Sequence, residues 1–150
     1  KDRSPFTLSG GEKRKTAIAG VLATEPEYII LDEPTAGLDP ESRDNILSGI
    51  KELHTKYKKT VILVTHDMNQ VALLCDRVFI MEKGKIVLQG TLNEVFSQVE
   101  ALETYSLDVP QITRLMHRLK EKGISVNTEI YTVEEALKEI KKIKGGKGKQ

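Results

Sequence analysis

The sequence lacks several features that mark common protein classes. Cys75 is its single cysteine, so no disulfide can form within the chain, and a cytosolic setting is favoured. Apolar runs such as residues 61–64 fall far short of the roughly 18 residues that a membrane-spanning helix needs, and no secretory leader is recognisable. The 23 basic and 22 acidic residues nearly balance, which argues by composition against a strongly basic nucleic-acid-binding protein.

What remains is the composition of a globular protein. The 150 residues include 39% hydrophobic and 30% charged side chains, enough for one domain with a substantial core. The chain begins at Lys1 rather than at methionine and opens in a loop-like stretch. We therefore expect it to be a piece of a longer protein.

Helical and extended patterns alternate along the first two thirds of the chain. Short, continuously apolar segments predict strands buried on both faces, and Asp or Ser residues before amphipathic segments predict capped helices. In order, we expect a helix from Ser9 to before Pro26, a strand at 28–31, a helix from Pro40 with an apolar stripe of Ile46, Leu47, Ile50 and Leu53, a strand at 60–65, a helix at 67–74, and a hairpin of strands 77–81 and 85–88. This order predicts an α/β fold whose mainly parallel sheet has an antiparallel edge hairpin.

The character of the sequence changes after Ser97, which divides the chain into predicted domains 1–97 and 98–150. Thr91 and Glu94 form a capping-box pattern just before this boundary, and Thr132 and Glu135 form another beyond it. We expect a small C-terminal α/β extension with helices at 110–122 and from Thr132 to about residue 143. The Gly/Lys-rich end, 144–150, is expected to be disordered.

Two carboxylates follow the first predicted strand. Asp32 and Glu33 end the apolar segment that begins at Tyr28, and ligand sites in open α/β sheets lie beyond the carboxyl ends of strands. Asp32 could hold Mg²⁺, which prefers oxygen ligands, and Glu33 could polarise an attacking water. The alternative is an ordinary exit from strand to loop, because Pro34 follows directly.

Two further segments carry candidate chemistry. A predicted helix begins with Ser9, Gly10, Gly11 and Glu12. Free N–H groups and glycines at a helix start favour the approach of phosphate; the alternative is a capped helix with a flexible entry.

His66 follows the second predicted strand and could bind a phosphate oxygen or orient water, although a lone histidine is more often structural. His54 and His117 lie inside helical patterns and are interpreted as structural only.

Taken in order, these motifs resemble the second half of an ABC-type ATPase. Residues 8–12 are similar to the family's signature, with Glu12 in place of the usual glutamine, and residues 29–32 are similar to its Walker B strand. Glu33 then corresponds to the catalytic glutamate, Ala36 to Asp39 to the D-loop, and His66 to the switch histidine.

The resemblance implies a partial P-loop NTPase domain that works with ATP and Mg²⁺. Two such subunits enclose two ATP molecules: Ser9, Gly10, Gly11 and Glu12 would face the partner's nucleotide, while Asp32, Glu33 and His66 would serve their own. The Gly-Lys pairs at residues 84–85, 146–147 and 148–149 are not followed by Ser or Thr, as a P-loop requires. The P-loop is therefore expected upstream of Lys1.

A narrower resemblance points to the ATPase subunits of energy-coupling-factor transporters. It rests on the Ser-Pro-Phe at residues 4–6, the segment 34–40, and Leu107-Asp108-Val109-Pro110 with the amphipathic pattern that follows. This likeness implies a subunit that powers import of a vitamin or a transition-metal ion such as cobalt, at the cytoplasmic face of the membrane. It implies a second ATPase subunit, identical or related, and integral membrane subunits as partners, and no nucleic acid.

Two other functions stay open at this stage. One is a non-transport ATPase of the same superfamily that acts on DNA or ribosomes. The other is a non-catalytic module in which residues 98–150 bind a partner or dimerise. The apolar stripe that would serve such a module consists of Ile112, Leu115, Met116 and Leu119.

Overall fold

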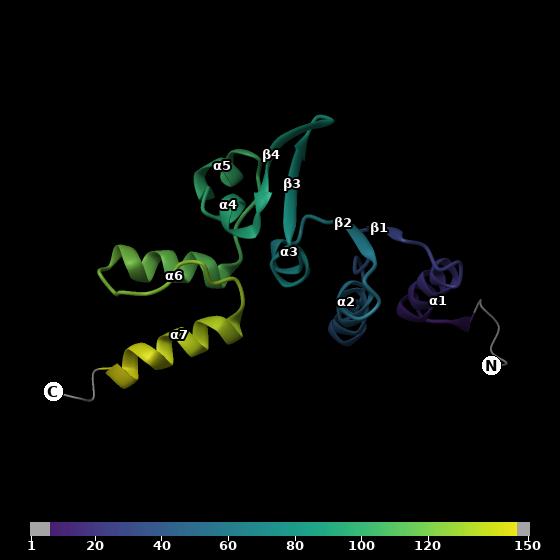
Figure 1. Cartoon of the computed structure of the whole chain (residues 1–150), viewed down its shortest axis with the longest axis horizontal. Coiled ribbons are helices and arrows are strands. Elements are labelled where there is room, and N and C mark those ends of the chain that lie inside the picture. Colours follow the sequence, from purple (N-terminus) through teal and green to yellow (C-terminus); the bar gives the residue numbers. More distant parts are fainter. Residues whose placement is uncertain (1–6, 147–150) are drawn as a thin grey trace. The chain divides into compact units, whose positions relative to one another are not determined.

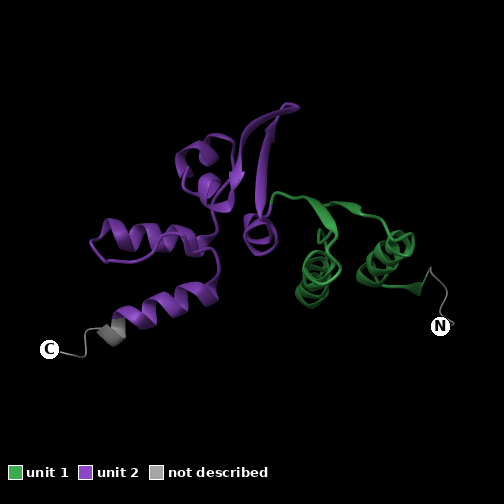
Figure 2. Ribbon diagram, viewed as in Figure 1, with its two compact units in different colours: residues 1–66 green, residues 67–150 purple. Residues whose placement is uncertain are grey.

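The structure is a computed structural model that describes residues 7–146, with side chains as far as Ile143 (Figure 1). The chain divides into two compact units, residues 1–66 and residues 67–150 (Figure 2). Residues 1–6 of the expected loop-like opening and the end of the chain at 147–150 lie outside the described residues. Within the described part, no helix combines the length and the apolar character that crossing a membrane requires.

The first unit alternates helices and strands. Its elements are α1 (Gly10–Leu22), β1 (Tyr28–Asp32), α2 (Pro40–Thr55) and β2 (Thr60–Val64). Ser9 and Glu12 form a capping box at the start of α1. Asp39 caps α2, and Pro40 occupies its first position, where the missing N–H of proline has no intrahelical partner to lose. The predicted helix starts are therefore confirmed.

The two strands of this unit pair in parallel. The register runs from Tyr28 opposite Thr60 to Asp32 opposite Val64, so the carboxyl ends of β1 and β2 lie side by side. Helix α2 makes the crossover between them, and its predicted stripe is buried. The strand residues Ile29, Leu31, Val61 and Leu63, which alternate with the exposed ones, are buried or half-buried.

The opposite face of this small sheet is open. Ile30 retains 69% of its exposure and Ile62 48%, with Tyr28 and Val64 exposed on the same side. The expectation of strands buried on both faces is thus wrong for the described residues. The reason is that α2 covers only one side of the two-stranded sheet, and no other element among residues 7–66 covers the second.

The second unit combines a hairpin with short helices. Its elements are α3 (Met68–Leu74), β3 (Arg77–Glu82), β4 (Lys85–Thr91), α4 (Leu92–Phe96), α5 (Val99–Thr104), α6 (Gln111–Glu121) and α7 (Val133–Gly146). Lys83 and Gly84 form the turn, both with positive φ (48° and 76°), as a two-residue hairpin favours. A register shift between Ile80 and Met81 marks a bulge in the antiparallel pair.

The strands of each unit pair with one another. In the described residues β1 pairs with β2 and β3 pairs with β4, which gives two separate two-stranded sheets. Each strand thus pairs with the strand next to it in sequence. Helix α2 connects β1 to β2, and the turn at Lys83–Gly84 connects β3 to β4. The α/β class is confirmed, and the place of the hairpin at the edge of the parallel sheet stays a prediction.

The C-terminal segment is helical where the sequence predicted an α/β extension. Residues 98–146 contain α5, α6 and α7 and no strand. The second capping box forms as predicted, since Glu135 N donates to Thr132 Oγ1 (3.3 Å) and Thr132 N donates to Glu135 Oε2 (3.1 Å). Helix α7 continues to Gly146, so residues 144–146 are helical rather than disordered.

Two apolar clusters hold the second unit together. One joins the hairpin residues Val78 and Ile80 to Phe96, Leu102 and Val109, so residues on both sides of position 97 share a core. The other centres on Met116 and Ala136, with Ile112 and Leu119 packed against it. The stripe on α6 is therefore largely occupied within the unit, and the domain boundary expected at residue 97 stays a prediction.

Candidate functional site

The carboxyl ends of β1 and β2 bring Glu33 and His66 together. Because the strands are parallel and in register, the residues that follow them leave the sheet at the same edge. The backbone N–H of Glu33 donates to the carbonyl oxygen of Val64 at 2.9 Å, which extends the ladder by one residue. The sequence placed both residues beyond strand ends, and the structure makes them neighbours.

The Glu33 carboxylate is held by the end of β2 at several points. Its Oε1 lies 2.6 Å from His66 Nδ1 and accepts from the backbone N–H of His66 at 3.1 Å. Thr65 Oγ1 donates to Oε2 at 3.5 Å. The hydrogen bond with the His66 side chain is the largest cause that lowers the pKa of Glu33; burial acts in the opposite direction, and the other hydrogen bonds reinforce the lowering. The carboxylate is thus kept ionised and fixed in direction.

Exposure of this pair leaves it open to a ligand. The His66 side chain is 83% exposed, whereas that of Glu33 is 34% exposed. A carboxylate that is ionised, oriented and accessible is suited to accept a proton from water. The geometry thus provides a general-base candidate and a neighbouring imidazole on one rim of the sheet.

Asp32 precedes Glu33 at the end of β1. It is exposed, and within residues 7–146 it accepts no hydrogen bond. In the same part of the chain no group of three or more His, Cys, Asp or Glu residues could hold a metal ion. A single free carboxylate nevertheless fits Mg²⁺, which in nucleotide sites is held by one or two carboxylates together with waters and phosphates.

Residues 9–12 form the start of α1. Ser9 N donates to Glu12 Oε2 (2.8 Å) and Glu12 N donates to Ser9 Oγ (3.2 Å), so Glu12 completes the capping box of its own helix, with Ser9 as the cap. A Cβ on Gly11 would lie 2.8 Å from Ser42 Oγ, whereas a Cβ on Gly10 would meet nothing within 4 Å. Gly11 therefore permits the close approach of α1 and α2, and Gly10 leaves the helix start open.

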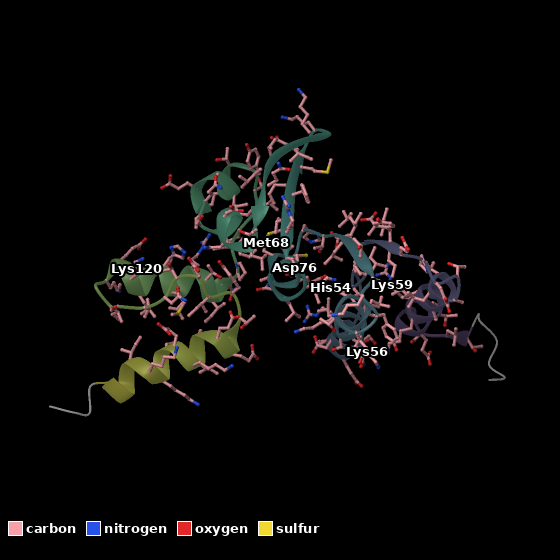
Figure 3. The ribbon with its side chains drawn as sticks, in the orientation of Figure 1. His54, Lys56, Lys59, Met68, Asp76 and Lys120 are labelled. Atoms are coloured by element: carbon pink, nitrogen blue, oxygen red, sulfur yellow. The ribbon has the colours of Figure 1, made fainter. Side chains whose placement is uncertain are left out.

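Asp39 has a local structural function. It caps α2 by accepting from Ser42 N at 2.9 Å. This backbone hydrogen bond is the largest cause that lowers the pKa of Asp39. His54 is likewise local: its Nδ1 lies 3.3 Å from the carbonyl oxygen of Lys59, near the C-terminal end of α2 (Figure 3).

Arg14 is a site residue that the sequence did not reveal. From α1, its Nη1 lies 3.0 Å from the carbonyl oxygens of both Glu33 and Pro34 and 3.1 Å from that of Ala36. These acceptors are backbone atoms, so no residue type in the loop signals the contact. A basic residue on a helix start is otherwise read as a solvated charge.

Comparison with known proteins shows what this chain is similar to. The family model described as ABC transporter matches residues 1–36. Among solved structures, cbiO1 from Clostridium perfringens, described as part of the ABC transporter complex cbiONQ, is 44% identical, with a TM-score of 0.60 over 78% of this chain and 47% of that one. The ATP-binding cassette MJ0796, in a dimer bound to ADP and Pi, is 34% identical, with a TM-score of 0.55 over 61% of this chain and 39% of that one. Over the part that they share, the chain is similar in sequence and in fold to ABC transporter ATP-binding domains.

Its high-identity relatives are energy-coupling-factor transporter ATPases. The energy-coupling factor transporter ATP-binding protein EcfA2 of Clostridium tetani is 56% identical over 143 residues, which cover 95% of this chain and 50% of the relative. The chain thus spans about half the length of the curated relatives it matches.

Proposed function

We propose that this chain supplies the hydrolytic half of an ATP-driven transporter subunit. The observation that carries the proposal is the Glu33–His66 pair at the carboxyl ends of two parallel strands, with Oε1 and Nδ1 2.6 Å apart. The likeness of the chain to energy-coupling-factor ATPases supports assigning ATP as the substrate.

In the proposed reaction Glu33 is the general base. Its carboxylate accepts a proton from a water molecule as that water attacks the terminal phosphorus of ATP, and ADP leaves. The lowered pKa of Glu33 keeps the group ionised at neutral pH, so that it is ready to accept this proton. His66 directs the carboxylate, and its exposed ring is free to contact the phosphate that is cleaved.

Asp32 is the proposed Mg²⁺ ligand. Its exposed carboxylate follows the same strand and is free of hydrogen bonds within the described residues. When bound, the ion would neutralise negative charge on the phosphates.

The start of α1 is proposed to act on the nucleotide of a partner subunit. Ser9, Gly10, Gly11 and Glu12 form a helix N-terminus whose open side is at Gly10, where backbone N–H groups can meet phosphate. Asp39, at the start of α2, is proposed to lie in the loop that faces the partner. The partner is a second ATPase subunit, identical or related, and no nucleic acid is involved.

The proposed cellular function is solute uptake. Integral membrane subunits would convert closure of the ATPase pair into transport, and this chain would lie at the cytoplasmic face of the membrane. The solute is proposed to be a vitamin or a metal ion, chosen by the membrane subunits; the likeness to cbiO1, part of the cbiONQ complex, supports this assignment.

A fusion protein tests the proposal. The N-terminal half of the Clostridium tetani relative, which should supply the phosphate-binding loop, is joined to this chain at the matching position. We expect Mg²⁺-dependent hydrolysis of ATP by the fusion and none by either half alone. A soluble, folded fusion that binds ATP but releases no phosphate would contradict the proposed activity.

A further inference from the structure

We propose that Arg14 is a positioning residue for Glu33: it ties α1 to the hydrolytic site through the backbone of the loop that joins β1 to α2. The proposal rests on the function proposed above. It concerns the carbonyl cluster, defined as the carbonyl oxygens of Glu33, Pro34 and Ala36, which converge on Nη1 of Arg14 at 3.0–3.1 Å.

The carbonyl cluster needs a cation or several donors at its centre. Three carbonyl dipoles that converge at one point present their negative ends to one another. The Nη1 atom carries only two hydrogens, so at least one is shared between acceptors. Hydrogen bonds from a charged donor are roughly twice as strong as neutral ones, and the guanidinium stays charged at every relevant pH.

The backbone of this loop is strained at Glu33, the proposed general base. Glu33 has φ of +41°, in the left-handed region that a residue with a side chain rarely adopts. This conformation turns the chain sharply after β1 and directs the carboxylate to the end of β2, where Oε1 meets His66. Without a restraint on its carbonyl, Glu33 would relax toward an extended conformation and its carboxylate would move.

Arg14 supplies that restraint from a second element. The guanidinium belongs to α1, while the carbonyls belong to the loop between β1 and α2. The loop's own hydrogen bonds, from Ala36 N to Glu33 O and from Leu38 N to Thr35 O, are 3.1 and 3.2 Å long. Contacts between α1 and the loop therefore add to the two backbone hydrogen bonds within the turn. A displacement of α1 would therefore displace the backbone of Glu33 as well.

The first test uses this chain alone and needs no activity. Arg14→Met keeps the length of the side chain and removes its donors, and Lys15→Met, at an exposed neighbouring position, is the matched control. We expect amide hydrogen exchange at Ala36 and Leu38 to rise at least about tenfold in Arg14→Met, as loss of charge-assisted bonds implies, and to stay unchanged in the control. Exchange in the middle of α2, at Ile50, should not change. Unchanged protection at Ala36 and Leu38, or an equal rise at Ile50, would overturn the proposal.

The second test measures turnover in the fusion protein. Arg14→Met should lower kcat by about 10- to 100-fold, the effect of a misplaced catalytic group, and leave the Kd for ATP unchanged. Arg14→Lys, which retains a charge and three donors, should restore part of the loss. In a Glu33→Gln background Arg14→Met should have no further effect, because the group that it positions is already absent.

The outcomes separate this proposal from the function on which it rests. An unaltered fusion without ATPase activity contradicts the proposed function, and the positioning role with it. An active fusion in which Arg14→Met has normal kcat, or lowers kcat by the same factor with and without Glu33→Gln, overturns the positioning role alone.

Discussion

Oε1 of Glu33 and Nδ1 of His66 lie 2.6 Å apart, although 32 residues separate them in the chain. The parallel register of β1 and β2 creates this contact, because both residues leave the sheet at the same edge. The backbone N–H of His66 binds the same oxygen at 3.1 Å, so the direction of the carboxylate depends on the end of β2 as well as on its own strand.

Replacement of His66 should raise the pKa of Glu33. The hydrogen bond with the His66 side chain is the largest cause that lowers this pKa, and burial, which raises it, remains in His66→Ala. In the wild-type chain, an NMR titration of the Glu33 carboxyl carbon should have its midpoint below the ordinary 4.5. The midpoint should move upward in His66→Ala and stay in place in His54→Ala, whose ring lies near the carbonyl of Lys59 instead. An unchanged midpoint in His66→Ala would show that the pair is not formed in solution.

The same shift predicts how stability depends on pH. Because the folded pKa of Glu33 lies below the unfolded value of 4.5, the ionised carboxylate stabilises the fold above that pH. This contribution is lost as the pH falls through the folded pKa. The difference in free energy of unfolding between wild type and Glu33→Gln should therefore shrink as the pH is lowered from about 5, just above the unfolded value of 4.5, through the lower folded pKa. Urea titrations at each pH provide the measurement, and a difference that does not change with pH would contradict the assignment.

Ser9→Arg should separate nucleotide binding from closure. In the fusion protein, the Kd of a monomer for ATP should stay unchanged, because the start of α1 is proposed to face the partner's nucleotide. ATP-driven dimerisation should be lost, since a bulky cation would occupy the space where backbone N–H groups meet phosphate. Thr16→Arg, at an exposed position further along α1, is the control. Equal loss of monomer affinity would place the signature in its own subunit's site.

Met116 and Leu115 should differ sharply in their contribution to stability. Both lie on α6, but Met116 is fully buried in a cluster with Val126, Ile130 and Ala136, whereas Leu115 is 44% exposed. Met116→Ala should lower the free energy of unfolding of the second unit by about 2–5 kcal/mol. Leu115→Ala should change it by less than about 0.5 kcal/mol. An effect of Met116→Ala as small as that of Leu115→Ala would mean that the stripe on α6 is not packed within the chain and is available to a partner, as an interaction module requires.

The chain alone should neither bind nor hydrolyse ATP. Its sequence contains no Gly-Lys pair followed by Ser or Thr, and Asp32, Glu33 and His66 reach only the metal and the reacting end of the nucleotide. The exposed apolar face of the β1–β2 sheet should also make it self-associate. Isothermal titration with Mg-ATP and sedimentation at several concentrations provide the measurements. Micromolar binding by a monomer would contradict this prediction.

Local patterns in the sequence predicted local structure well. The stripe from Ile46 to Leu53 is buried, and the capping boxes at Thr91 and Thr132 form, because each depends on residues within one or two helical turns. Helix α5 was missed, since it is six residues long and Gln98 provides no side-chain cap. A short apolar run cannot signal whether both faces of a strand are covered, which explains the error at Ile30.

In the candidate site, too, local features could be predicted from the sequence and long-range contacts could not. Asp32, Glu33 and His66 could be found because each follows an apolar run at a strand end. The distance between Glu33 and His66 depends on strand register, and the contacts of Arg14 depend on backbone carbonyls, so neither has a signal in residue type.

The central claim, that Glu33 is the base in ATP hydrolysis, is tested most directly by Glu33→Gln in the fusion protein. The amide keeps the shape of the carboxylate but cannot accept a proton from water. We predict that the variant binds ATP and forms the ATP-bound dimer as the wild type does, while kcat falls by about 10²- to 10⁴-fold. Glu41→Gln, an exposed acid in the first turn of α2, should retain full turnover. Hydrolysis by Glu33→Gln at the wild-type rate would contradict the account.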